Sequence, residues 1–228
     1  GPNVLSTFQS RGLGPERATV TYAELGGRWT AHDFEWFGTS PRTGEYVDAS
    51  VLVTQKTWGA NFTAQKLQVQ GQKLWHLFRY DPPLFILGIR FNAGTVFSPD
   101  DNLTADLPIR FLTFLGGESD LRGFDRQSLP RSGVGALSGA TGSIEARFHK
   151  VIFRRADVYT FLDAGMLGQA RLKLDPTKFL SPGTGVRWES PIGTLRGYVA
   201  QRFVMDKPDT EPDYGREFRL GLTFGEEF

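Results

Sequence analysis

One arginine and two acidic residues in the second half of the chain could form a buried ionic contact. Arg122 stands in a glycine-containing loop, and Glu145 and Asp163 stand on the next two extended segments. An enclosed arginine cannot lose its proton, so it needs carboxylate or carbonyl partners. If the loop is enclosed, we expect Arg122 to pair with Glu145, Asp163 or both.

Other reactive chemistry is not indicated by the sequence. His32, His76 and His149 share no ligand spacing with one another, and the chain has no cysteine, so no zinc site is predicted. No nucleophile elbow and no phosphate-binding loop occur. The stretch 100–102, Asp-Asp-Asn, is better explained as a solvated loop tip than as a calcium site. We therefore predict no catalytic residue, metal or cofactor, and a protein that is not an enzyme.

The segments that must position these residues alternate between apolar and polar with a period of two, which is typical of β-strands. In the last segment, Phe218, Leu220, Leu222 and Phe224 alternate with polar residues or glycine. Alternation likewise places Ser143, Glu145 and Arg147 on one face of their segment. The predicted strands are 18–25, 28–37, 46–58, 62–78, 84–97, 141–152, 156–167, 183–190, 193–204 and 216–226.

Composition restricts the class of protein. The formal charge of the 228 residues is +1, which argues against a nucleic-acid partner. No apolar run approaches the ~20 residues of a membrane-spanning helix, so a membrane location would require a closed barrel. Alternation alone does not separate such a barrel from a soluble one with an apolar core. Several strands of about ten residues favour the membrane barrel.

A long segment, 98–140, lacks alternation and interrupts an otherwise short-turned antiparallel meander. It contains the run Phe-Leu-Gly-Gly-Glu-Ser-Asp-Leu-Arg-Gly-Phe, ending at Phe124. This run resembles the signature loop of the BamA/TamA superfamily of outer-membrane assembly and translocation barrels. In that family the loop folds into the barrel, which implies that 98–140 is an ordered, lumen-inserted loop. The motif residues are Gly116, Gly117, Leu121, Arg122, Gly123 and Phe124.

The resemblance assigns roles to several of these residues. It implies that Arg122 is the inserted arginine, that Gly123 permits the tight backbone and that Phe124 anchors the loop tip. The runs Gly-Ser-Ile-Glu around Glu145 and Phe-Leu-Asp-Ala-Gly around Asp163 are similar to family motifs whose acids face the lumen and meet the loop arginine.

Two further runs extend the resemblance over roughly residues 107–228. The stretch 183–196 is similar to a family hairpin, with Thr194 where proline is usual. The alternating end of the chain resembles the terminal signal that the assembly machinery recognises in its clients. Its residues are Phe218, Leu220, Leu222, Phe224 and Phe228.

The resemblance implies one transmembrane β-barrel domain over 1–228, of about 10–12 strands, in the bacterial outer membrane. We expect the first and last strands to pair and so close the barrel. The family barrel has sixteen strands and carries POTRA modules, which are not found here, and Gly1-Pro2 looks like the remnant of a cleaved tag. The expected role is insertion or translocation of proteins or lipids, with membrane lipids and unfolded protein clients as partners. The alternatives are an anchor barrel for a passenger such as a patatin-like lipase, and a short plugged pore.

Overall fold

A computed structural model of the chain describes residues 23–37, 40–60, 62–78, 83–99, 107–153, 156–190, 193–208 and 214–224. Ten strands and one short 3-10 turn make up its regular structure. The elements are β1 (Glu24–Phe37), β2 (Ser40–Thr54), η1 (Lys56–Trp58), β3 (Ala64–Leu77), β4 (Phe85–Phe97), β5 (Ser138–Phe153), β6 (Ala156–Gly168), β7 (Lys178–Ser190), β8 (Gly193–Gln201), β9 (Phe203–Met205) and β10 (Phe218–Phe224).

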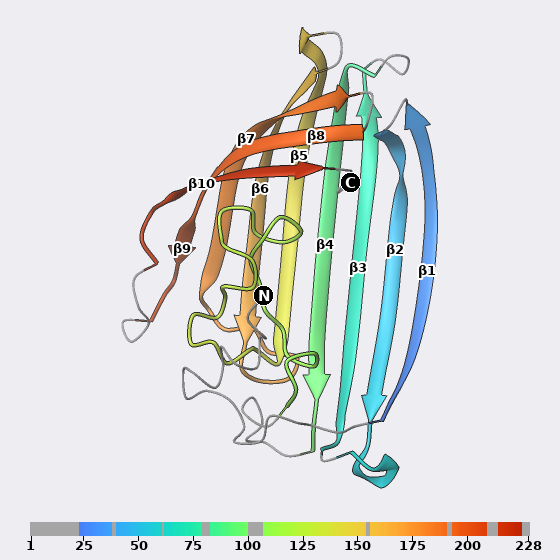
Figure 1. Cartoon of the computed structure of the whole chain (residues 1–228), viewed down its shortest axis with the longest axis vertical. Helices are drawn as coiled ribbons and strands as arrows, with labels where there is room; N and C mark the ends of the chain where they lie inside the picture. Colours follow the sequence, from blue (N-terminus) through green and yellow to red (C-terminus); the bar gives the residue numbers. More distant parts are fainter. Residues whose placement is uncertain are drawn as a thin grey trace.

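All ten strands belong to one antiparallel sheet in the order β1-β2-β3-β4-β5-β6-β7-β8-β10, with β9 paired to β7. Six long strands, β1 to β6, run side by side, and β7, β8 and β10 bend across one end of them (Figure 1). This is the predicted all-β antiparallel meander. Among the residues described, no helix is both long enough and apolar enough to span a membrane.

The distribution of charged and apolar side chains between the two faces of the sheet is the reverse of that in a soluble protein. Glu145 and Asp163 have no exposed surface, whereas Leu220 and Leu222 are 81% and 75% exposed. We call the face that bears the two acids the inner face and the face that bears the two leucines the outer face. Charged groups inside and apolar groups outside are the arrangement of a transmembrane barrel.

The alternation predicted from the sequence is found in the burial of several strands. On β3 and β4, for example, Leu67 and Val69 are exposed on the outer face, and their neighbours Gln68 and Asn92 meet on the inner face through a side-chain hydrogen bond of 3.3 Å. Alternation therefore fixed which residues share a face. The assignment of that face to the inside or outside required the fold.

Two expectations about the strands are wrong. We predicted separate strands at 18–25 and 28–37, but Glu24 to Phe37 form one strand, and Gly26 and Gly27 continue the ladder with β2. We also expected the first and last strands to pair. Among the described residues, β1 pairs with β2 and β10 pairs with β8, so neither edge meets the other.

In the connection between β4 and β5, residues 107–137 are folded on themselves; we call this part the inserted loop. Leu115 and Leu129 exchange backbone hydrogen bonds of 3.0 and 3.1 Å. Gly116 and Gly117 have φ values of 110° and 114°, a backbone conformation that other residues rarely adopt. Apolar residues of the loop form a buried cluster with residues of β6, β7 and the segment before β10: Leu115, Leu121, Phe124, Leu129, Ala136, Leu167, Phe179 and Tyr214.

The outer face of β10 gives the first prediction. Leu222→Arg places a charge where hydrocarbon is expected, so it should lower the free energy of unfolding by about 2–4 kcal/mol if this position lies near the bilayer midplane. The measurement is urea unfolding in lipid vesicles, with Leu222→Phe as the apolar control. If the arginine variant is as stable as the parent, the outer face of β10 does not face the lipid.

Candidate functional site

The Arg122 guanidinium binds the Asp163 carboxylate side-on. Arg122 Nε and Nη2 donate to Asp163 Oδ2 and Oδ1 over 3.0 and 2.7 Å, and the Arg122 backbone N–H also donates to Oδ2 at 3.0 Å. Two parallel N–H donors on one carboxylate form the most directional ion pair that proteins use. The third contact fixes the backbone of the loop to the same acid.

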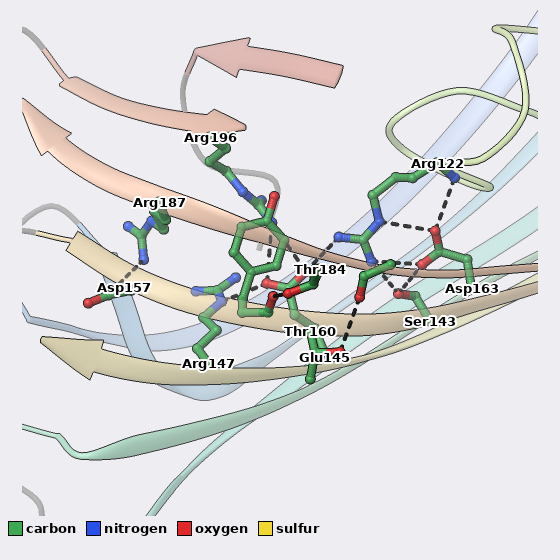
Figure 2. A network of polar contacts seen from close by, with 12 residues as sticks. Arg122, Ser143, Glu145, Arg147, Asp157, Thr160, Asp163, Thr184, Arg187 and Arg196 are labelled. Carbon is green, nitrogen blue, oxygen red and sulfur yellow. Dashed lines mark hydrogen bonds and ion pairs between the residues drawn. The ribbon is translucent and has the colours of Figure 1, made fainter. Parts of the chain in front are cut away.

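The second acid, Glu145, is shared by three arginines (Figure 2). Arg122 Nη1 donates to Glu145 Oε2 at 2.7 Å, and Arg147 Nε donates to Oε1 at 2.8 Å. Arg196 Nη2 lies 3.2 and 3.1 Å from the two oxygens. Glu145 therefore joins the inserted loop, its own strand β5 and strand β8 in one network.

The network is enclosed. Arg122 is 1% exposed. Its Cζ lies 3.4 Å from the centre of the Phe161 ring, and its Nη2 donates to Ser143 Oγ at 3.0 Å. Burial by itself would lower the pKa of the Arg122 guanidinium, but the hydrogen bonds and charges of Asp163 and Glu145 outweigh it and raise that pKa above its ordinary value. The side chain is thus held as a cation.

The strand register explains why these groups meet. Ser143 on β5 lies directly opposite Asp163 on β6, and Ser143 Oγ donates to Asp163 Oδ1 at 2.7 Å. Glu145, two residues along β5, points to the same face because side chains alternate. On β7 and β8, Arg187 and Arg196 are register partners and would repel each other, so each requires an acid beside it.

The acid for Arg187 is Asp157, in a second cluster near the far end of β5 and β6. Asp157 Oδ1 accepts from His149 Nδ1 at 2.8 Å when the ring carries that proton, and Asp157 Oδ2 lies 3.8 Å from Arg187 Nη1. All three residues are buried. His149 thus contributes to a polar cluster.

The loop tip is held by three further contacts. The Gly123 N–H donates to Ser181 Oγ on β7. The Phe124 ring packs edge-on against Phe179, with centroids 5.8 Å apart. The carbonyl oxygen of Phe124 accepts from Arg219 Nη1 on the terminal strand β10. The loop is therefore attached to β5, β6, β7 and β10.

The structure brings most of the sequence-predicted site residues together. Arg122 contacts both Glu145 and Asp163, and Gly116, Gly117 and Leu121 lie in the turn that carries it. The terminal-strand residues lie apart from this site, on the outer face, and Phe228 lies outside the described residues. These outward residues are Phe218, Leu220, Leu222 and Phe224.

Sequence reasoning did not assign several members of the network. Arg147 was placed on the inner face by alternation, and Arg196 closes the hairpin motif, but neither was named as a partner of Glu145. Alternation placed Arg219 on the polar face of the last strand, but nothing in the sequence indicated its contact with the loop or the role of Ser181. The contacts of these residues join segments far apart along the chain, and local patterns do not report such contacts.

Comparison with known proteins identifies relatives of the chain. The profile of the Omp85 superfamily domain matches residues 33–224. Among solved structures, the chain is similar to the crystal structure of BamA from Haemophilus ducreyi lacking POTRA domains 1–3, with a TM-score of 0.64 and 15% sequence identity. The similarity covers 88% of this chain and 42% of that one, so the chain spans less than half of the BamA chain that it matches.

The second prediction concerns the tight approach at Gly123. A Cβ atom there would lie 2.5 Å from Ser181 Oγ and 3.0 Å from the Gln201 carbonyl oxygen. Gly123→Ala should therefore displace the loop tip and lower the free energy of unfolding by about 1–3 kcal/mol. Protease cleavage within residues 107–137 should become faster in the folded protein.

The matched control is Gly142→Ala, because a Cβ at Gly142 would meet only the Arg90 carbonyl oxygen, at 3.9 Å. If the two alanine variants resist the protease equally well, the loop tip is not seated as described.

Proposed function

The chain belongs to the Omp85 superfamily and is a bacterial outer-membrane β-barrel, and from this premise we propose that it acts in the insertion or translocation of proteins at the outer membrane. Its partners would be membrane lipids and unfolded protein clients. The observation that carries this proposal is the inserted loop, which buried ion pairs hold against the inner face of a sheet whose residues match the Omp85 superfamily domain. As part of the same proposal, β1 accepts the client strand, since its partner in the described structure is β2.

Strand β1 has fourteen residues, and in the described structure each of them pairs with a residue of β2. An edge strand offers a row of unpaired N–H and C=O groups, and an extended segment can add to it by main-chain hydrogen bonds. Within hydrocarbon those groups have no water to bind, which makes pairing with an incoming strand strongly favourable. A client that ends in an alternating apolar strand has the required pattern.

The inserted loop supports this proposal by its connection to the other edge of the sheet. Arg219, on the inner face of β10, donates to the Phe124 carbonyl oxygen, and its Nε lies 3.5 Å from Asp125 Oδ1. The short terminal strand pairs only with β8 in the described structure. The loop therefore acts as an internal brace that holds β10 to β5 and β6.

A disulfide-trapping experiment tests the proposal. The chain has no cysteine, so Gly27→Cys introduces a single thiol on the outer face of β1. A Cβ at Gly27 would meet only Val51 Cγ1, at 3.5 Å, so the variant should fold. The probe is a synthetic peptide with the sequence of residues 216–228 carrying one cysteine in place of Leu222. We expect an oxidant to join the peptide to the barrel in lipid vesicles.

The matched control is Ile144→Cys, which is also exposed on the outer face but lies on β5, between two paired neighbours. It should give at least tenfold less adduct than Gly27→Cys. Equal trapping at the two positions, or no trapping at Gly27→Cys, would refute the role of β1 as an acceptor edge.

A further inference from the structure

The connection between β6 and β7, residues 169–177, folds back over the outer face of the sheet. The Leu172 N–H donates to Thr95 Oγ1 on β4 at 3.1 Å, and Ser138 Oγ on β5 donates to the Ala170 carbonyl oxygen at 2.8 Å. Thr95 and Ser138 are themselves hydrogen-bonded at 2.8 Å. Because side chains of two other strands bind this connection, it is held in one position on the outer face of the sheet.

Two residues show that the backbone conformation of this connection is restricted. A Cβ at Gly168 would clash with the Lys173 carbonyl group, so only glycine lets the segment approach the strand. Leu172 has a φ of 54°, in the left-handed region that leucine rarely adopts, and is nevertheless 75% exposed. Such strain persists where surrounding contacts impose it, and it is concentrated at functional positions.

The fold-back creates an apolar groove of about 280 Å³ on the outer face. Ala93 and Ala140, which are register partners on β4 and β5, supply small side chains at its floor. Larger apolar side chains line it from β3 and from the connection itself: Leu67, Val69, Leu172 and Leu174. Because this face carries the apolar residues of a transmembrane barrel, the groove opens toward lipid.

Two cations accompany the groove. The connection reads Arg171-Leu172-Lys173-Leu174, so basic residues alternate with the leucines, and both basic side chains are exposed. The acidic residue of the segment, Asp175, is half-buried, and its N–H donates to the Leu167 carbonyl oxygen at 2.8 Å. The exposed charge beside the groove is therefore positive.

We infer that this groove is a binding site for a membrane lipid with an anionic phosphate head group. One acyl chain lies in the groove between Leu67 and Leu174, and Arg171 and Lys173 bind the phosphate at the level of the head groups. An apolar groove in contact with hydrocarbon requires an apolar occupant, and an acyl chain is the one that the membrane supplies. Long basic side chains at that depth extend to the interface, where each attracts anionic lipid.

Native mass spectrometry of the detergent-purified protein tests this site, with phosphatidylglycerol as the probe and phosphatidylcholine as the zwitterionic comparison. We expect one tightly retained phosphatidylglycerol per chain. Replacing both basic residues, Arg171→Gln with Lys173→Gln, should weaken its retention by roughly tenfold or more, because each charge contributes independently. Ala140→Phe should weaken it comparably by filling the groove while leaving the charge intact.

The control for charge is Lys56→Gln, which removes an exposed lysine from the β2–β3 connection and should leave retention unchanged. Retained heat-modifiable migration on a gel shows that each variant is folded. The inference is overturned if phosphatidylcholine is retained as well as phosphatidylglycerol, or if either groove variant binds like the parent. It is also overturned if glycerol phosphate, which lacks acyl chains, competes as well as the lipid does.

Discussion

The enclosed charge of Arg122 is the constraint on which the rest of the molecule depends. A guanidinium that is 1% exposed must be neutralised, and its two carboxylate partners come from neighbouring strands whose register places both on one face. Removing either acid would leave an uncompensated buried charge, at a cost of about 3–5 kcal/mol. The ion pairs therefore fix the loop, and the loop in turn requires glycine at 123 and an apolar socket for Phe124.

The same constraint explains the inversion of the sheet. Because polar groups collect around the inserted loop, apolar side chains are left for the outer face, and the outer face then requires lipid. Adjacent residues of β10 show both the inward polar contact and the outward apolar surface. Arg219 binds the loop backbone, and Leu220 is 81% exposed. The loop and the membrane-facing surface are thus two consequences of one alternating pattern.

Sequence patterns predicted the local part of this structure and missed most of the long-range part. Alternation placed Glu145 and Leu222 on their faces, and the Arg-Gly-Phe motif indicated which arginine is enclosed. The arginines that share Glu145, the seat of Gly123 on Ser181 and the fold-back at Leu172 were not predicted, because each joins strands whose proximity depends on register. Pairing of the first and last strands was expected because a closed barrel has no edge, yet the described sheet leaves both edges unpaired with each other.

A double-mutant cycle on Arg122 and Asp163 tests the central claim most directly. The free energy of unfolding in lipid vesicles is measured for the parent, Arg122→Ala, Asp163→Ala and the double variant. Since both single changes delete the same contact, the loss in the double variant should fall short of the sum of the single losses by more than ~1 kcal/mol. Losses that add within ~0.5 kcal/mol would contradict a buried ion pair as the support of the inserted loop.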